Sequence, residues 1–212
     1  MSNTIHAKKD TIVPATIFLA LYTIWAILVS SGKQIIHQFD QAVIGIICNT
    51  NPANIKFATT FTNLGNTSVI VLETIVLFII LVVFKKYAYA CFTAGTMIAA
   101  NGYNWIIKHA IARHRPYVHH LVTAHGYSFP SGHSVGSATL FGILIVLTIL
   151  LVKNKTGKTI LCIIWTCFPL LIGYTRIFTH VHYPSDVLGG FLEGITFVLI
   201  GYSVLYHYYL KE

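Results

Sequence analysis

Residues 135–152 read VGSATLFGILIVLTILLV, a run of 18 positions without a charged side chain. A helix that crosses the hydrocarbon core of a bilayer needs about 20 predominantly apolar residues, with a usual range of about 17–25. Because lipid offers no hydrogen-bond partners, the backbone of such a stretch satisfies itself as a helix. The run therefore predicts a transmembrane helix.

The composition of the whole chain supports a membrane protein. The 212 residues are 55% hydrophobic and 9% charged, with a mean hydropathy of +0.71, whereas soluble domains carry about 25% charged residues. Five further apolar segments are long enough to span: 14–31, 67–84, 87–107, 159–175 and 187–209. We therefore expect an all-α, polytopic membrane protein, with six transmembrane helices bundled in a single domain over residues 1–212. The first segment is interpreted as an uncleaved span, because no clear small-x-small cleavage site follows it.

The positions of the basic residues predict the orientation. One side of a six-span arrangement carries short turns and termini rich in lysine: Lys8, Lys9, Lys85, Lys86, Lys153, Lys155, Lys158 and Lys211. Loop Lys and Arg mark the cytoplasmic face, so both termini are predicted to be cytoplasmic in a multi-pass protein of the plasma membrane. Residues 32–66 are then a non-cytoplasmic loop, long enough to hold a short interfacial helix. Nucleic acid is not an expected partner, despite the net charge of +8.

Three polar stretches fall on the predicted non-cytoplasmic side, at 108–116, 130–133 and 175–186. They read KHAIARHRP, PSGH and TRIFTHVHYPSD. Lys108 is a point charge, and Arg115 and Arg176 offer planar forks that suit phosphate oxygens. Ser131 and Gly132 lead into a helix whose first amides have no partner and favour an anion. The sequence therefore predicts an anion-binding site at this interface.

The last stretch allows two interpretations. His180, His182 and Asp186 have the residue types of a metal-binding cluster, and a histidine nucleophile with an orienting carboxylate uses the same types. Each residue also has an ordinary explanation when taken alone, since a lysine beside a span is usually an interfacial anchor and Asp186 is a routine helix cap. The joint position of all three stretches at one membrane face favours a functional site.

The three stretches together resemble the type 2 phosphatidic acid phosphatase superfamily, which includes integral membrane lipid phosphatases. Its signature is Lys-x6-Arg-Pro, Pro-Ser-Gly-His and Ser-Arg-x5-His-x3-Asp. Here these parts read Lys108-x6-Arg115-Pro116, Pro130-Ser131-Gly132-His133 and Thr175-Arg176-x5-His182-x3-Asp186. Thr175 replaces the usual serine and keeps the hydroxyl.

The resemblance implies a role for each residue. His182 would be the nucleophile, Asp186 its orienter and His133 the general acid. Lys108, Arg115, Ser131, Gly132 and Arg176 would bind the phosphoryl oxygens. Neither a metal nor another cofactor is expected, which leaves His180 without an assigned role. Glu193, two helical turns after Asp186, is expected to pair with a polar neighbour such as Asn101 or Asn104.

The resemblance therefore implies a metal-independent hydrolase of bacterial type that acts on a lipid phosphate or pyrophosphate through a phosphohistidine. Undecaprenyl pyrophosphate, phosphatidylglycerophosphate and phosphatidic acid are the candidate substrates, and membrane lipids are the expected surroundings. No obligate protein partner is predicted. Two alternatives stay open: a lipid phosphotransferase that uses the same intermediate, and a non-enzymatic membrane protein that binds or transports an anionic lipid.

Overall fold

The chain folds into helices and short connections in the computed structural model, which describes residues 2–48 and 51–210 and, for residues 2–10, the backbone alone. The long helices are α1 (Ser2–Ser30), α4 (Thr67–Val83), α5 (Tyr87–Ile111), α6 (Gly132–Leu151), α7 (Lys155–Phe178) and α8 (Pro184–Leu205). The shorter ones are α2 (Gln34–Ile47), α3 (Pro52–Phe61), η1 (Thr62–Gly65) and the π-helical η2 (Tyr206–Leu210). The described residues contain no strand, and the all-α prediction is confirmed for them.

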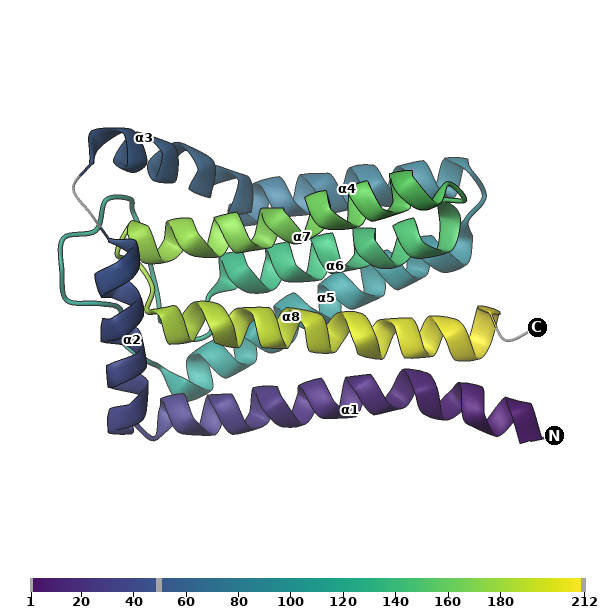
Figure 1. Ribbon diagram of the computed structural model, residues 1–212, viewed down its shortest axis with the longest axis horizontal. Coiled ribbons are helices and arrows are strands. Elements are labelled where there is room, and N and C mark those ends of the chain that lie inside the picture. Colours follow the sequence, from purple (N-terminus) through teal and green to yellow (C-terminus); the bar gives the residue numbers. More distant parts are fainter. Residues whose placement is uncertain (1, 49–50, 211–212) are drawn as a thin grey trace.

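The six long helices run side by side, and α2 lies across one end of them (Figure 1). α1 begins and α8 ends at the opposite end of this bundle. α6 occupies the centre, where it packs against α4, α5, α7 and α8, while α1 packs along α8. Of the most apolar part of α6, 61% is buried inside the protein, so α6 forms the core on which the other helices are arranged.

Four helical segments of the described residues are long and apolar enough to cross a membrane: Thr11–Ser30, Gly132–Leu151, Lys155–Phe178 and Pro184–Leu210. A fifth candidate joins Pro52–Gly65 to Thr67–Val83 across a bend of 49°. α5 has 25 residues but is not among the candidates, because polar residues such as Thr93, Thr96 and Asn104 lie along it. These three side chains are buried against neighbouring helices. Four or five spans therefore follow from length and composition, and the sixth remains a prediction.

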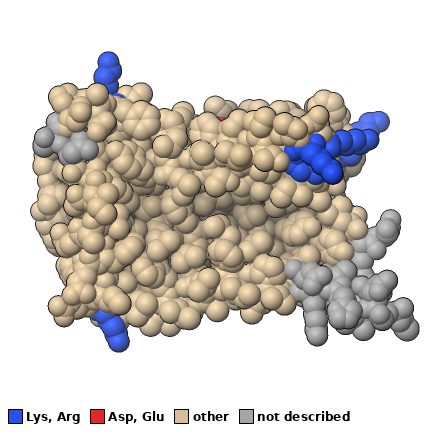
Figure 2. Space-filling view, in the orientation of Figure 1, with Lys and Arg blue, Asp and Glu red and all other residues tan. Residues whose placement is uncertain are grey.

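The charged side chains lie mainly at the two ends of the bundle. Blue side chains gather at the end where the α4–α5 and α6–α7 turns lie, and the visible face between the ends is nearly all tan (Figure 2). These turns contain Lys85, Lys86 and Lys153, and Lys155 and Lys158 follow in the first turn of α7. Lys211 lies outside the described residues, as do the side chains of Lys8 and Lys9. An apolar belt between charged ends is the surface that a bilayer requires.

The described part of residues 32–66 is mostly helical, since it contains α2, α3 and η1. Helix α2 buries Ile36 and Asp40, and contacts both α7 and α8. At the start of α3, Asn51 caps the helix by accepting a hydrogen bond from the amide of Ala53 at 2.9 Å, and Pro52 fits the first helical position. The segment thus covers the end of the bundle where the three motifs lie.

α8 packs closely against the first turns of α6. A Cβ added at Gly190 would lie 2.8 Å from the carbonyl oxygen of Ser131 and 2.7 Å from the Cβ of Ser134. One at Gly194 would lie 2.8 Å from the Cβ of Ala138. The two glycines let the helix backbones approach closely, as small residues do in membrane bundles. This packing fixes the Pro-Ser-Gly-His turn against α8.

Candidate active site

The three motifs meet at the end of the bundle that α2 covers (Figure 1). Lys108 lies in the last turn of α5, and Arg115 follows in the connection to α6. Gly132 and His133 begin α6, with Ser131 as the N-cap. Arg176 lies in the last turn of α7, and Asp186 lies in the first turn of α8. Residues more than 70 positions apart in the chain are thereby brought to one place.

His182 and Asp186 form the centre of this arrangement. Nδ1 of His182 lies 3.5 Å from Oδ2 of Asp186, and 3.3 Å from the hydroxyl of Ser128. The amide of Tyr183 donates to the same Oδ2 at 2.9 Å, as does the hydroxyl of Ser128. Asp186 is fully buried and His182 is 2% exposed. The carboxylate is therefore held by fixed donors and faces one ring nitrogen of the histidine.

The other ring nitrogen of His182 faces a cation. A terminal nitrogen of Arg115 lies 3.1 Å from Nε2 of His182. Because a guanidinium can only donate, Nε2 must accept, which places the ring proton on Nδ1, opposite Asp186. This tautomer leaves the lone pair of Nε2 directed at the place where Arg115 can hold an anion. A nucleophilic imidazole with an orienting carboxylate has this geometry.

The surroundings of His182 favour its neutral form. Burial, and then the positive charges of Arg115, Arg176 and Lys108, lower the pKa of His182 well below its ordinary value of 6.5. Burial disfavours the imidazolium because it removes water from a charged group, and nearby cations repel it. At neutral pH the ring is therefore unprotonated at Nε2 and can attack an electrophile.

The Pro-Ser-Gly-His turn is fixed by two neighbours. The amide of Ser131 donates to the backbone oxygen of Asp186 at 3.1 Å, and Nζ of Lys108 donates to the oxygen of Pro130 at 2.7 Å and to that of Tyr127 at 3.0 Å. The hydroxyl of Ser131 accepts from the amide and the hydroxyl of Ser134, at 3.4 and 3.0 Å. Ser131 therefore caps α6, and the proton of its own hydroxyl remains available to a ligand.

Arg176 and His133 both contact the segment that precedes α4. Arg176 is 4% exposed, and a terminal nitrogen donates to the hydroxyl of Thr62 at 2.8 Å. Its Nε is one of two buried side-chain atoms without a hydrogen-bond partner among the described residues. Such a group costs about 1–3 kcal/mol, and an anion would remove this cost. Nε2 of His133 lies 3.0 Å from Oδ1 of Asn66.

Three further polar residues join the site that sequence reasoning did not single out. Ser128 contacts both His182 and Asp186, as described above. Arg113 donates to Oδ1 of Asp186 at 2.6 Å and to Oδ2 of Asp40 at 3.0 Å. Asp40 lies on α2 and is 1% exposed. One signal pointed to Asp40: the chain has only six Asp and Glu residues, so each acid is a candidate for a specific ion pair.

His180, in the spacer of the third motif, has a local role. His180 has a backbone φ of 61°, a left-handed conformation at the turn between α7 and α8, and its Nδ1 lies 3.2 Å from the oxygen of His119. Among the described residues, no group of three or more His, Cys, Asp or Glu side chains could hold a metal ion. His180 thus belongs to a turn, and the His-x-His pair does not form part of a ligand cluster.

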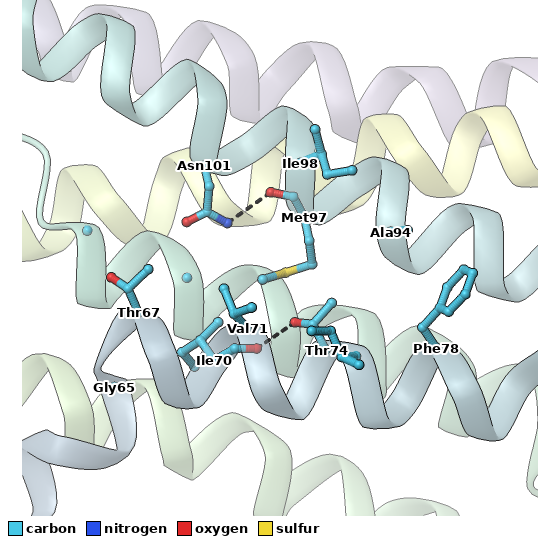
Figure 3. Close-up of a pocket in the computed structure, with 13 residues that line it drawn as sticks. Gly65, Thr67, Ile70, Val71, Thr74, Phe78, Ala94, Met97, Ile98 and Asn101 are labelled. Atoms are coloured by element: carbon cyan, nitrogen blue, oxygen red, sulfur yellow. Dashed lines mark hydrogen bonds between the residues drawn. The ribbon is translucent and has the colours of Figure 1, made fainter.

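Glu193 lies below the site, as the sequence suggested, and is fully buried. Its Oε2 accepts from Asn104 at 3.4 Å and from the hydroxyl of Tyr22 at 3.1 Å. Of the two expected partners, Asn104 is confirmed, whereas Asn101 donates to the backbone oxygen of Met97 at 2.9 Å instead (Figure 3). Glu193 therefore links α1, α5 and α8.

An apolar pocket leads away from the site between α4 and α5. It has a volume of about 430 Å³ and is lined at one end by Gly65, the last residue of η1, and by Gly132 of the motif turn. Ile70, Met97 and Ile98 line its middle, and Phe78 lies at the far end (Figure 3). Of the motif residues, only Gly132 lines the pocket. An apolar pocket that adjoins a cationic, hydrogen-bonding site suits an amphiphilic ligand.

Comparison with known proteins gives the same family as the motifs. The model of the PAP2 superfamily matches residues 88–209. Phosphatidylglycerophosphatase B of Bacillus subtilis is 35% identical over 96 residues, which are 43% of this chain and 46% of that protein. Undecaprenyl-diphosphatase BcrC of the same organism is 33% identical over 105 residues, 47% of this chain and 49% of that protein. The chain thus spans about half the length of the curated relatives that it matches.

Solved structures share the fold. The crystal structure of a transmembrane PAP2-type phosphatidylglycerolphosphate phosphatase from Bacillus subtilis superimposes with a TM-score of 0.80 at 23% identity, covering 90% of this chain and 94% of that one. The structure of Aquifex aeolicus LpxE gives a TM-score of 0.62 at 26% identity, covering 76% and 93%. With more than half of its residues matched by the family model, the chain belongs to the PAP2 superfamily.

Proposed function

We propose that this protein is a membrane lipid phosphatase that transfers the phosphoryl group of a lipid phosphate or pyrophosphate to His182 and then to water. The observation that carries the proposal is the pair of contacts at His182. Nδ1 lies 3.5 Å from Asp186, and Nε2 lies 3.1 Å from Arg115. A protein that only bound or transported an anionic lipid would need the cations but not an oriented, neutral imidazole.

In the first step, Nε2 of His182 attacks phosphorus, and a nitrogen–phosphorus bond forms as the bond from phosphorus to the lipid oxygen breaks. His133, protonated when the anionic substrate is bound, gives its proton to that leaving oxygen. Asp186 stabilises the positive charge that develops on His182. The cations Lys108, Arg115 and Arg176, with Ser131 and the amide of Gly132, stabilise the charge on the phosphoryl oxygens.

In the second step, water attacks the phosphohistidine. His133 takes a proton from this water, the nitrogen–phosphorus bond breaks, and inorganic phosphate leaves. His182 returns to its neutral form and His133 to its protonated form. The proton balance closes without a metal, because one histidine acts as acid in the first step and as base in the second.

The proposal includes a placement in the plasma membrane. Six helices would cross it, including α5, with the lysine-rich turns in the cytoplasm and the site at the outer interface. The asymmetry of the lysines supports this orientation. The lipid tail would occupy the apolar pocket between α4 and α5, and the phosphate would meet the cations beyond Gly132. Phosphatidylglycerophosphate, undecaprenyl pyrophosphate and phosphatidic acid all have this division into tail and phosphate.

The proposal is tested by phosphate release from purified protein in detergent with a chelator present, using these three lipids as a panel. We expect release from at least one lipid and a loss of at least about 10³-fold in His182→Ala, the scale seen when a nucleophile is removed. His180→Asn is the matched control, because asparagine tolerates the left-handed backbone of that turn, and we expect it to keep its rate.

A second measurement identifies the intermediate. Brief reaction with ³²P-labelled lipid, quenched in alkali, is expected to leave label on the wild type and none on His182→Ala. If the wild type releases no phosphate from any lipid, or if His182→Ala keeps its rate, the proposed function is wrong. If label forms but passes to an added alcohol in preference to water, the protein is the phosphotransferase instead.

A further inference from the structure

Asp40 is a buried carboxylate on a helix outside the family motifs. Its Oδ1 accepts from the amide of Ser185 at 2.8 Å, and its Oδ2 accepts from the hydroxyl of Ser185 at 2.8 Å and from Arg113 at 3.0 Å. A carboxylate that is 1% exposed is costly unless it is paired and hydrogen-bonded. All its bonds go to Arg113 and to the residue immediately before Asp186, so Asp40 is directed at the catalytic carboxylate.

Arg113 joins the two acids. One terminal nitrogen donates to Asp186 at 2.6 Å and to the hydroxyl of Ser185 at 2.7 Å, and the other donates to Asp40 at 3.0 Å. The guanidinium also lies 4.2 Å from the centre of the Tyr183 ring. The backbone oxygen of Arg113 accepts from the amide of Ser128 at 2.7 Å. Lysine cannot replace this planar fork, because it offers a single charged nitrogen.

The two oxygens of Asp186 are thereby divided between different partners. Arg113 takes Oδ1, and Oδ2 remains for Ser128, the amide of Tyr183 and Nδ1 of His182. The carboxyl group cannot rotate without breaking a charge-assisted bond, which is about twice as strong as a neutral one. The orientation of His182 therefore depends on a contact that originates on α2.

We propose that Arg113 and Asp40 are positioning residues for phosphoryl transfer, which hold Asp186 in line with His182 and balance its charge. This inference rests on the proposed function of His182 as the nucleophile. It makes α2 part of the active site, although α2 carries no residue of the family motifs. The charges alternate along the series Asp40, Arg113, Asp186 and the imidazolium that forms during the reaction.

If Arg113 balances the charge of Asp186, its removal should change the pH at which His182 titrates. A purely structural role of Arg113 would not have this effect. His182 is faced by Arg115 in the connection, Lys108 on α5, His133 on α6, Arg176 on α7 and Asp186 on α8. Asp186 is the acid in this set, and Arg113 shares its charge. Without Arg113, Asp186 would have the imidazolium as its main counter-charge. The charged form of His182 would then be favoured, and its titration would move to higher pH.

The experiment compares Arg113→Gln, Arg113→Lys and Asp40→Asn with Lys56→Gln, which removes one exposed charge at the same end of the bundle. The turnover of a lipid phosphate is measured in detergent as kcat and KM over a range of pH, together with the unfolding temperature. For Arg113→Gln we expect kcat to fall about 10- to 100-fold, by analogy with the loss of a residue that orients a metal ligand. KM should stay within about 3-fold of the wild-type value. The acidic limb of the pH profile of kcat should move to higher pH.

The conservative variants separate charge from geometry. Arg113→Lys keeps the charge, so its acidic limb should stay near that of the wild type while kcat falls. Asp40→Asn keeps the shape but leaves Arg113 to Asp186 alone, so its acidic limb should not move to higher pH. Lys56→Gln should match the wild type in all three quantities. If Arg113→Gln lowers only the unfolding temperature, or raises KM at unchanged kcat, the inference is wrong.

An NMR titration, which needs no turnover, separates a failure of this inference from a failure of the proposed function. The titration of His182 is followed by NMR in protein labelled at its histidines, with His182→Ala to assign the signal. If the wild type has no phosphatase activity but the His182 signal still titrates at higher pH in Arg113→Gln, the charge coupling holds and the proposed function fails. An active wild type in which Arg113→Gln leaves the titration unchanged overturns the coupling alone.

Discussion

The two histidines of the site differ in the partners of their ring nitrogens. His182 lies between an acid and a cation, with Asp186 at Nδ1 and Arg115 at Nε2. His133 has a neutral partner, since its Nε2 faces the amide oxygen of Asn66 at 3.0 Å. An amide oxygen can only accept, so it holds a proton on that nitrogen. The contrast suits a division of labour in which His182 attacks and His133 carries the proton.

This division predicts that loss of His133 depends on the leaving group. With a lipid phosphate, the leaving alkoxide needs a proton, so His133→Ala should lose about 10²–10⁴-fold in rate, the usual contribution of a general acid. With p-nitrophenyl phosphate, the leaving group needs no proton, and the first step should survive. Because the second step still lacks its base, rapid mixing should record a burst of one nitrophenolate per enzyme, followed by slow turnover.

The control for this prediction is His182→Ala, which should give no burst with either substrate. If His133→Ala lost the same factor in rate with both substrates and showed no burst, His133 would be assigned to phosphate binding and not to proton transfer. A full rate with the lipid phosphate would remove His133 from the mechanism altogether.

At the level of elements, the site depends on how closely α6 and α8 approach each other. The carbonyl of Ser131, at the start of α6, would lie 2.8 Å from a Cβ at Gly190, and the amide of Ser131 is bonded to the backbone of Asp186. The Pro-Ser-Gly-His turn and the start of the helix that carries Asp186 are thus a single packed unit. The short distance between the turn and α8 depends on a glycine of α8 and not on any catalytic side chain.

Gly190→Ala is therefore expected to reduce both stability and activity. The added methyl group would force the turn away from α8, and overpacking of this kind costs about 1–3 kcal/mol. Gly95→Ala on α5 is the matched control, because no atom lies within 4 Å of a Cβ at Gly95, and we expect it to be neutral or slightly stabilising. Unfolding temperature and phosphate release measure the two effects, and equal behaviour of the two variants would contradict the close packing.

The sequence predicted the helical elements better than it predicted the residues that surround His182 and Asp186. The apolar runs mark α1, α4, α6, α7 and α8, because a lipid-facing helix is apolar over most of its length. The contact between Arg113 and Asp40 was not predicted, because neither a spacing nor a motif joins residues 73 positions apart. Their contact arises from α2 folding over the end of the bundle, and residues 32–66 were expected to be largely a loop.

At the scale of the whole molecule, α5 is the element in which composition and position disagree. It runs beside the other long helices (Figure 1), yet it is not apolar enough to count as a span on its own. The disagreement has a physical explanation, because seven of its residues, including Thr93, Thr96 and Asn104, are buried. Polar side chains that face the interior of a bundle are not exposed to lipid, so they avoid the free-energy cost of that exposure. We therefore expect α5 to cross the membrane with the others.

Cysteine labelling tests this crossing and the orientation together. The two markers are Lys86→Cys, just before α5, and Tyr117→Cys, beyond its end and 86% exposed, each in a background where Cys48, Cys91, Cys162 and Cys167 are serine. A membrane-impermeant maleimide is added to right-side-out and to inside-out vesicles. Because the lysine-rich turns are predicted to be cytoplasmic, Tyr117→Cys should react in right-side-out vesicles and Lys86→Cys in inside-out ones. Reaction of both from one side would show that α5 does not cross, and exchange of the two results would reverse the orientation while leaving six spans intact.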